Sequence, residues 1–121
     1  MCIRDRVNTT DLYTTIASFA GLEVKTRDSY NIRPILEGRS GLRKYVYVEH
    51  FKDHPAKVGN SLGWAIRDAQ YKLVVLQGKP PLLFDLNADP FEETDLLTGQ
   101  PSADSQAKAI ELLLAFEEIR K

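Results

Sequence analysis

The sequence predicts an α/β chain of the α+β kind, in which a small antiparallel sheet of about four strands is packed by a C-terminal amphipathic helix. Three observations predict it. Four short runs rich in β-branched and aromatic residues follow one another between residues 44 and 86. Residues 102–121 instead repeat apolar side chains at helical spacing. Residues 8–21 show the same helical pattern ahead of the strands.

The composition is that of an ordinary globular domain. With 121 residues, 43% of them hydrophobic and 27% charged, the chain suits one small domain but is short for a complete enzyme with a metal site. Its 16 basic and 17 acidic residues are interspersed, which argues against a nucleic-acid or membrane-surface partner. No apolar run approaches the roughly 18 residues that cross a bilayer. The single cysteine, Cys2, excludes an internal disulfide and a cysteine-based zinc site.

The first helix is predicted over residues 8–21. Asn8 or Thr9 can cap its N-terminus, Asp11 favours the positive end of the helix dipole, and Gly21 suits the position after the C-terminus. One side of this helix is apolar and needs a partner to bury it: Leu12, Ile16 and Phe19.

A short helical turn is predicted over Asn31–Gly38, with Pro34 in its first turn and Gly38 ending it. The stretch Arg39–Arg43 is typical of a hinge, because Gly41 lies there among charges. We therefore expect a boundary between two structural units at this point.

The four strand-like runs are Lys44–His50, Gly63–Asp68, Tyr71–Gln77 and Leu82–Leu86. Only Ala69 and Gln70 separate the second run from the third, which predicts a tight antiparallel hairpin. Ala-Gln is poor chemistry for a two-residue turn, so a longer or bulged loop stays open.

Two helix starts are predicted after the strands. Asp89 can cap, Pro90 suits the first helical position and Glu92 completes a capping box, so a helical turn is expected there. The helix over residues 102–121 should cover one face of the sheet. Its apolar side is predicted to be Ala109, Leu112, Leu113, Phe116 and Ile119, with Arg120 and Lys121 at the negative end of its dipole.

Three segments also carry longer patterns. Val7–Leu22 follows vs-x-x-D-l-x-P-T-l-l-x-l-a-G with Thr14 in place of the proline, and Ala65–Leu73 follows a-i-R-x-x-x-y-K-l. Residues 83–96 follow L-y-D-L-x-x-D-P-x-E-x-x-N-L with Asp95 in place of the asparagine, and this is the most specific of the three. In this order, over about residues 7–100, they resemble the formylglycine-dependent sulfatases of the alkaline phosphatase superfamily.

The resemblance implies the C-terminal portion of a sulfatase, a sulfuric ester hydrolase. Family members convert a Cys or Ser in C/S-x-P-x-R to formylglycine and hold a divalent metal, usually calcium, with acidic and Asn or His residues. These residues precede the helix with which this chain opens, so we expect no catalytic residue, metal ligand or cofactor in the chain. We expect it to be inactive alone and to fold poorly.

Residues 1–6 are expected to be a non-native start, because this unpatterned charged hexapeptide gives way abruptly to a helix start. The resemblance implies that residues 7–40 are the tail end of the catalytic α/β domain with its last helix and that residues 41–121 are a C-terminal subdomain. This subdomain is expected to help frame the substrate pocket. The implied partners are the missing N-terminal catalytic domain and a sulfated small molecule or glycan. The parent enzyme is expected to be periplasmic, secreted or lysosomal.

Two short segments imitate site motifs. Cys2–Arg6 has the Cys and Arg of the maturation motif but lacks its proline, and Asp53-His54 is followed by Pro55 rather than glycine. His50 and His54 would meet on one side of a helix, but Pro55 and the preceding strand disfavour a helix here. We interpret Asp53-His54 as a solvated loop rather than a metal site.

Four residues are substrate-facing candidates: Arg67, Lys72, His50 and Trp64. A two-residue turn would place Arg67 opposite Lys72, and two cations across a ladder need an anion. The anion could be Glu49, which alternation puts on the opposite face from Val46 and Val48, or the anionic substrate, whose oxygens suit a guanidinium fork. The same turn makes two further cross-strand pairs, Ile66 with Leu73 and Trp64 with Val75.

Other functional residues have two interpretations. Trp64 is either core or a platform that stacks on a sugar or aryl group. A group of carboxylates invites an acid/base or calcium site but is better explained by strand ends and caps: Asp85, Asp89, Glu92 and Glu93.

Two other functions stay open. One is a free-standing binding or interaction module, because a fold alone does not fix a function. The other is part of a related phosphoesterase or phosphonate hydrolase, which the same superfamily scaffold would serve.

Overall fold

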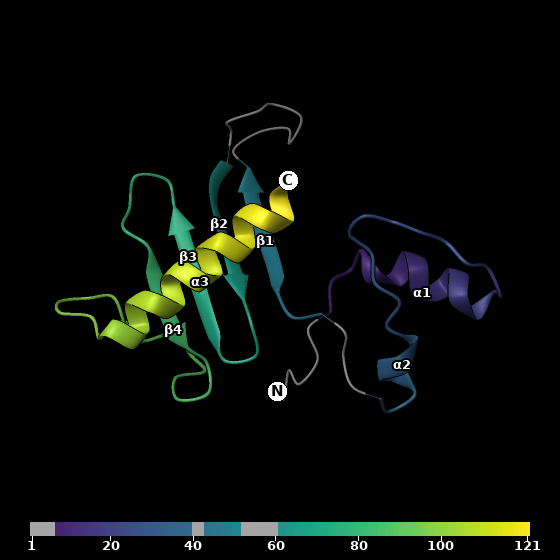
Figure 1. Ribbon diagram of the computed structural model, residues 1–121, viewed down its shortest axis with the longest axis horizontal. Coiled ribbons are helices and arrows are strands. Elements are labelled where there is room, and N and C mark those ends of the chain that lie inside the picture. Colours follow the sequence, from purple (N-terminus) through teal and green to yellow (C-terminus); the bar gives the residue numbers. More distant parts are fainter. Residues whose placement is uncertain (1–6, 40–42, 52–60) are drawn as a thin grey trace. The chain divides into compact units, whose positions relative to one another are not determined.

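The computed structural model describes residues 7–39, 43–51 and 61–121 (Figure 1). The chain forms two compact units, Met1–Val46 and Tyr47–Lys121. The expected boundary between residues 40 and 41 falls outside the described residues. The elements are, in order, α1 (Asp11–Phe19), α2 (Arg33–Leu36), β1 (Val46–Phe51), β2 (Ser61–Arg67), β3 (Tyr71–Leu76), β4 (Leu82–Asp85) and α3 (Ala103–Arg120).

The first unit holds α1 and α2. Helix α1 begins at Asp11, later than the predicted caps, and Thr10 at its N-cap makes no side-chain cap hydrogen bond. The carboxylate of Asp11 instead accepts from the backbone N–H of Asn8 at 2.8 Å. Gly21 ends the helix with φ +75°, and Gly38 follows α2 with φ +83°, as predicted for both.

The interior of this unit combines polar side chains with the apolar Ala17 and Ile32. Asp11, Thr14 and Thr15 are buried, whereas the predicted apolar side of α1 faces outward. The exposed fractions of that side are 51% for Leu12, 65% for Ile16 and 56% for Phe19. The helix therefore has an uncovered apolar side.

The second unit is the predicted four-stranded sheet, with strands in the order β1-β2-β3-β4. Strands β2 and β3 pair antiparallel in the predicted register, Arg67 with Lys72, Ile66 with Leu73 and Trp64 with Val75. Strand β4 pairs antiparallel with β3, Leu83 lying opposite Leu73. Apolar alternation fixes this register, because a slip by one residue would turn every buried side chain outward.

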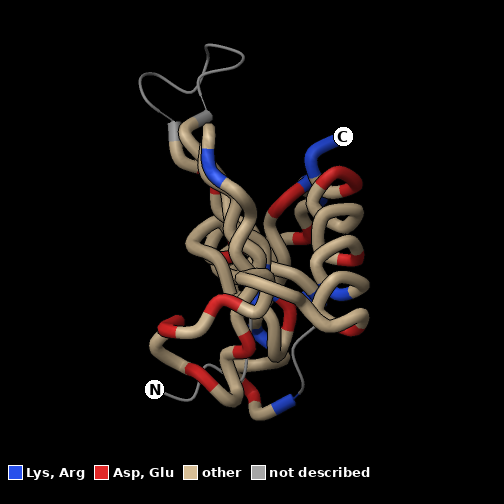
Figure 2. Tube along the Cα trace, turned by 90° about the vertical axis from the view of Figure 1, so that its left-hand side faces the viewer, with Lys and Arg blue, Asp and Glu red and all other residues tan. Residues whose placement is uncertain are grey.

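Helix α3 covers one face of the sheet and packs on β2 and β3 (Figures 1 and 2). The Ser102 side chain caps it by accepting from the backbone N–H of Ser105 at 3.0 Å. Its buried residues are Leu112, Ala115 and Phe116. The predicted apolar side is therefore partly wrong, because Leu113 and Ile119 are 39% and 40% exposed. The other fully buried core side chains of this unit are Ile66, Leu73 and Leu83.

The predicted helical turn at Asp89–Glu92 does not form. Residues 89–92 make a tight turn, in which the backbone N–H of Glu92 donates to the carbonyl of Asp89 at 3.3 Å. Glu92 then adopts φ +60° instead of continuing a helix. The Asp89 carboxylate accepts from the N–H of Thr94 at 2.7 Å, so the capping residues serve a loop rather than a helix.

Candidate functional site

The β2–β3 hairpin carries three of the four predicted site residues, Trp64, Arg67 and Lys72. Its turn explains how Ala-Gln can close it. The Asp68 side chain accepts from the backbone N–H groups of Gln70 and Tyr71 at 2.8 and 2.7 Å. A carboxylate thus replaces the turn chemistry that the two turn residues lack. Burial opposes ionisation of Asp68, but those two N–H groups and the Lys108 ammonium more than offset it and lower its pKa.

Helix α3 anchors this turn through Lys108. Its ammonium lies 3.4 Å from Asp68 and 2.6 Å from Glu111, and 5.5 Å from the ring centroid of Tyr71. The hydrogen bond to Glu111 and the charge of Asp68 outweigh burial and raise the pKa of Lys108. The end of the hairpin that bears the two cations is therefore fixed from the α3 side.

The two cations have different surroundings. The Lys72 ammonium is 2.7 Å from both carboxylate oxygens of Glu92, and the two side chains are 27% and 33% exposed. The Arg67 Nε donates to the carbonyl of Asp68 at 3.3 Å. Over the described ranges, Arg67 makes no ion pair.

The predicted role of Glu49 as partner of these cations is wrong. Its side chain is 10% exposed, and its Oε1 lies 3.1 Å from Arg120 of α3 without hydrogen-bond alignment, so the contact is electrostatic. Tyr47 contacts Phe116 edge-on at 5.9 Å. Because side chains alternate along a strand, Val48 and His50 lie on the other face of β1. Val48 is 65% exposed there.

His50 lies on the same face of the sheet as Arg67 and Lys72 but far from them along the strands. It is exposed and lies near the end of β1, which runs opposite to β2 (Figure 1). Arg67 ends β2, so the two residues lie toward opposite ends of the sheet. The hairpin therefore brings together two of the predicted site residues, and His50 stands apart from them.

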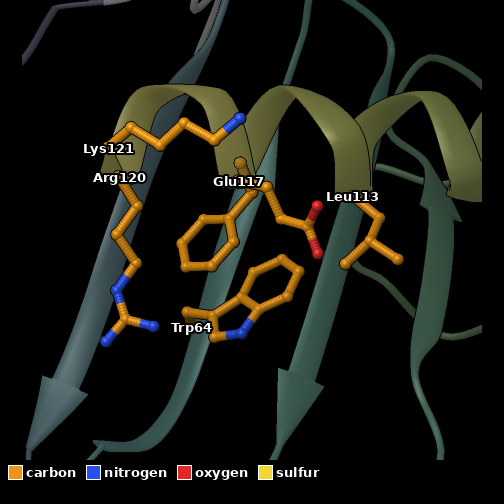
Figure 3. Close-up of a pocket in the computed structure, with 6 residues that line it drawn as sticks. Trp64, Leu113, Glu117, Arg120 and Lys121 are labelled. Carbon is orange, nitrogen blue, oxygen red and sulfur yellow. The ribbon is translucent and has the colours of Figure 1, made fainter.

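Trp64 lies on the α3 face of the sheet. Its ring stacks on Phe116 with 3.8 Å between centroids and 6° between planes. A hollow beside this stack is lined by Trp64, Leu113, Phe116, Glu117, Arg120 and Lys121 (Figure 3). Phe116 occupies one face of the indole, so at most the other face is available for stacking.

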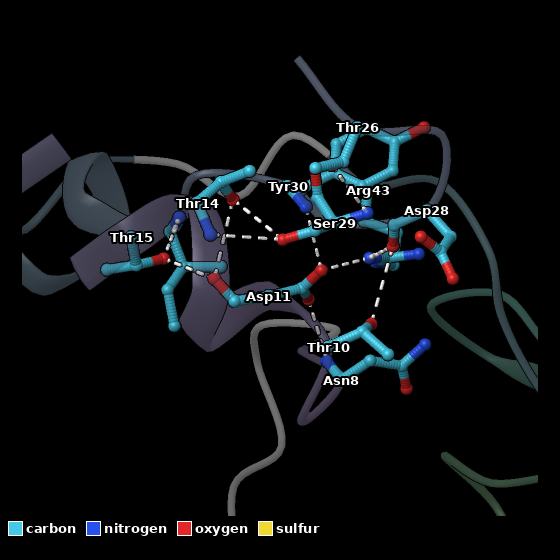
Figure 4. A network of polar contacts seen from close by, with 11 residues as sticks. Asn8, Thr10, Asp11, Thr14, Thr15, Thr26, Asp28, Ser29, Tyr30 and Arg43 are labelled. Carbon is cyan, nitrogen blue, oxygen red and sulfur yellow. Dashed lines mark hydrogen bonds and ion pairs between the residues drawn. The ribbon is translucent and has the colours of Figure 1, made fainter. Parts of the chain in front are cut away.

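A polar network around Asp11 was not predicted (Figure 4). Asp11 is fully buried, and its Oδ1 accepts from the backbone N–H of Tyr30 at 2.9 Å and from the Arg43 guanidinium. Arg43 also lies 4.3 Å from the ring centroid of Tyr30 and donates to the carbonyl of Asp28 at 3.3 Å. The Asp11 carboxylate therefore joins the start of α1 to two distant segments.

Two threonines of α1 extend this network. Thr15 Oγ1 donates to the carbonyl of Asp11 at 2.6 Å and accepts from the N–H of Ile32 at 3.0 Å. Thr14 Oγ1 lies 2.8 Å from the Ser29 hydroxyl, which also accepts from the N–H of Thr14 at 3.2 Å. These contacts hold the segment before α2 against α1. The sequence signal for them was the first family-like pattern, which specifies an aspartate at Asp11 and a threonine at Thr15.

Solved structures match this architecture over most of the chain. BT1596, a 2-O GAG sulfatase, gives a TM-score of 0.71 at 22% identity, covering 92% of this chain and 25% of that one. BT4656, in complex with its substrate D-glucosamine-2-N,6-O-disulfate, gives 0.69 at 24% identity, covering 90% and 23%. The phosphonate monoester hydrolase of Agrobacterium radiobacter gives 0.68 at 27% identity, covering 91% and 24%.

The chain has the fold of the C-terminal portion of sulfatases. It spans about a quarter of the length of the structures that it matches. A scan against protein-family models gives no match, and neither does a search of curated proteins.

The third sulfatase-like segment closes the loop between β4 and α3. Asp95 accepts from the N–H groups of Leu83 and Leu97 at 2.9 and 3.0 Å and from the Thr98 hydroxyl at 2.7 Å. Burial opposes its ionisation, but these bonds prevail and lower its pKa. The aspartate thus fills a structural role at the position where the family pattern has asparagine.

The other carboxylates of this segment also make local contacts. Asp85 accepts from the side chain of Gln70 at 2.8 Å and from the N–H of Asn87 at 3.0 Å. Burial opposes its ionisation, but these bonds lower its pKa. Asp89 accepts a hydrogen bond within the turn, and Glu92 pairs with Lys72. The interpretation of these three carboxylates as structural fits these contacts.

The structure shows no metal site among the residues that it describes. Across residues 7–39, 43–51 and 61–121, no three His, Cys, Asp or Glu residues cluster in a way that could hold a metal ion. The described residues therefore do not fit the calcium that the resemblance implies for the parent enzyme. Cys2, Asp53 and His54 lie outside the described residues. Among the described helices, none is long and apolar enough to cross a membrane.

Proposed function

We propose that this chain is the C-terminal part of a sulfuric ester hydrolase and that its β2–β3 hairpin helps to frame the substrate pocket. The observation that carries the proposal is the match to sulfatase structures over about 90% of this chain and about a quarter of theirs. The three sulfatase-like segments support it in the same order along the sequence. The catalytic apparatus then lies in the rest of the enzyme, where formylglycine would supply the nucleophile and calcium would stabilise charge on the sulfuryl group.

In this proposal the hairpin binds and orients the substrate but breaks no bond. The Arg67 guanidinium is fixed through its Nε, and its remaining N–H groups suit two oxygens of a sulfate or carboxylate. The substrate class is a sulfated glycan, by analogy with the disulfated glucosamine of BT4656. Lys72, His50 and Trp64 remain secondary candidates for contact with that glycan.

The uncovered side of α1 supports a partner within the same enzyme. Fully burying one side chain such as Leu12, Ile16 or Phe19 is worth about 1.5–3 kcal/mol. Three such burials rival the total stability of a small domain. In the proposed enzyme the missing catalytic domain covers this side, so the chain alone should be poorly stable and inactive.

The test begins with the coding DNA upstream of this chain. The proposal expects an in-frame extension that encodes C/S-x-P-x-R, and the protein expressed from the extended frame should release sulfate from an aryl sulfate. Replacing the Cys or Ser of that motif by alanine should abolish the release. An upstream stop codon that leaves the chain alone, stably folded and monomeric, would favour the free-standing module.

A phosphonate monoester hydrolase is the second candidate, because one such enzyme matches at 27% identity. The same expressed protein should be offered an aryl sulfate and an aryl phosphonate monoester in parallel. A kcat/KM that favours the phosphonate would replace the sulfatase assignment.

A further inference from the structure

The open face of the β2–β3 hairpin carries two cations in one cross-strand pair, but only one is neutralised. Arg67 and Lys72 are directly opposite, which places their Cβ atoms about 5 Å apart. Lys72 is held by both oxygens of Glu92, whereas Arg67 is bonded through Nε to a backbone carbonyl. The face therefore presents one uncompensated positive charge rather than two.

The position of Glu92 is set by the backbone as well as by the ion pair. Among the residues that the structure describes, only Glu92 combines a side chain with a positive φ, at +60°. A non-glycine residue in this region is uncommon and persists where the surroundings over-determine it. Here the Asp89 turn precedes it, and the N–H of Leu96 donates to the carbonyl of Leu83 at 2.8 Å after it. The loop thus delivers a carboxylate to Lys72 from twenty residues away.

We propose that Glu92 is a specificity-determining residue, because it neutralises Lys72 and leaves Arg67 as the one cation of the hairpin, residues 61–76, that has no ion-pair partner among the described residues and can meet an anionic ligand. This inference rests on the proposed function. The hairpin then accepts one oxyanion, a sulfate or a carboxylate, and discriminates against a ligand that brings a second one to the same place. Removing the Glu92 charge would convert the face into a site with two cations.

Charge and structure can be separated with two variants. Glu92→Gln releases the Lys72 ammonium and adds one positive charge to the face. The double variant Lys72→Gln, Glu92→Gln also loses the ion pair but restores the original charge of the face. A purely structural role predicts that both variants behave alike, whereas a charge-setting role predicts that only Glu92→Gln changes ligand preference.

The experiment compares monosulfated and disulfated glucosamine as ligands of the protein expressed from the extended frame. Glu92→Gln should shift the ratio of their KM values toward the disulfated sugar by about three- to fivefold, the size expected for one exposed charge pair. Added salt should weaken this shift. The double variant should return the ratio to that of the wild type. Arg67→Gln should raise both KM values by about tenfold or more.

Glu93→Gln is the matched control, because it removes the same charge from the adjacent exposed residue. The proposal is overturned if Glu92→Gln and Glu93→Gln give the same ratio of KM values for the two sugars. It is also overturned if the double variant keeps the shifted ratio of Glu92→Gln. A glucuronic acid monosaccharide distinguishes carboxylate from sulfate as the bound oxyanion. Titrating the protein directly with the same ligands tests the role of Glu92 separately from the sulfatase activity. Absence of sulfate release would end the proposed activity, but the ratio of the two binding affinities could still be measured.

Discussion

The two units of the chain differ in what they bury: the first buries three polar side chains beside Ala17 and Ile32, whereas the fully buried side chains of the second are apolar. In the first unit, α1 turns Asp11, Thr14 and Thr15 inward and leaves Leu12, Ile16 and Phe19 more than half exposed. In the second unit, Ile66, Leu73, Leu83 and Leu112 are almost fully buried between the sheet and α3. A polar interior depends on satisfied hydrogen bonds, whereas an apolar interior depends on removal of surface from water. The first unit is therefore held by specific hydrogen bonds but leaves the apolar side of α1 exposed.

The largest effect is expected from removal of the Asp11 carboxylate. Asp11→Ala leaves the guanidinium of Arg43, whose side chain is 11% exposed, without its buried carboxylate, and leaves the N–H groups of Asn8 and Tyr30 without their acceptor. Loss of one member of a buried pair costs about 3–5 kcal/mol. Hydrogen exchange should show faster opening of residues 8–32, while the strands keep their protection. Asp28→Ala, at an exposed aspartate of the same unit, should have little effect.

Truncating a buried apolar side chain of the second unit should destabilise that unit. Leu112→Ala removes a fully buried side chain from α3 and should cost about 2–5 kcal/mol. Leu114→Ala makes the same change two residues away, where the side chain is 59% exposed, and should stay within about 0.5 kcal/mol. Chemical denaturation monitored by Trp64 fluorescence measures both. Equal losses for the two variants would contradict the assignment of the buried face.

A third change separates the chain alone from the longer enzyme proposed above. Ile16→Gln removes an apolar side chain that is 65% exposed, so the stability of the chain alone should change by no more than about 0.5 kcal/mol. Binding of a dye that reports apolar surface should fall. In the protein from the extended frame, the same change should cost about 1.5–3 kcal/mol, because the side chain would be buried there. A neutral effect in both proteins would leave the apolar side of α1 without a partner.

The smallest effect concerns acid stability of the second unit. The pKa of Asp95 is lowered, as are those of Asp68 and Asp85, because hydrogen bonds to the carboxylates outweigh burial. A carboxyl group with a lower pKa in the folded chain stabilises it above the unfolded pKa of about 3.9. That contribution is lost as the pH falls through the folded value. Stability should therefore be level from pH 7 to about 5 and fall below about pH 4.

Asp95→Asn should make that fall shallower, because the amide keeps an acceptor oxygen but does not titrate. Urea midpoints at pH 7, 5 and 3.5 measure the difference. Glu118→Gln removes an exposed carboxyl from α3 and should keep the wild-type dependence. If Asp95→Asn keeps the wild-type dependence of stability on pH, Asp95 does not contribute to the loss of stability in acid.

Local patterns predicted the sheet well and tertiary contacts poorly. The four strands, the hairpin register and α3 followed from alternation and helical spacing, both of which are local. Asp11 was assigned to a helix dipole, because nothing near it in the sequence announces a partner 32 residues away at Arg43. The predicted helix at Asp89–Glu92 failed for the same reason, since Glu92 is engaged by Lys72, 20 residues earlier.

The candidate site was predicted in part. Pairing of Arg67 with Lys72 follows from a two-residue turn, but Ala-Gln gave no sign that Asp68 would supply the missing turn bonds. The face of β1 was assigned wrongly because Val46 and Val48 resemble core residues. In the structure Tyr47 and Glu49 lie toward α3 instead, one against Phe116 and the other beside Arg120.

The order of elements in the second unit has a consequence for synthesis. The hairpins β2–β3 and β3–β4 join neighbours in sequence and can pair as soon as they leave the ribosome. Their apolar face, however, is covered by α3, which is made after all four strands. Until residues 112–116 emerge, Ile66, Leu73 and Leu83 have no helix above them. Nascent chains stalled before residue 102 should therefore bind chaperones more than chains from which residue 121 has emerged, because their sheet has an uncovered apolar face.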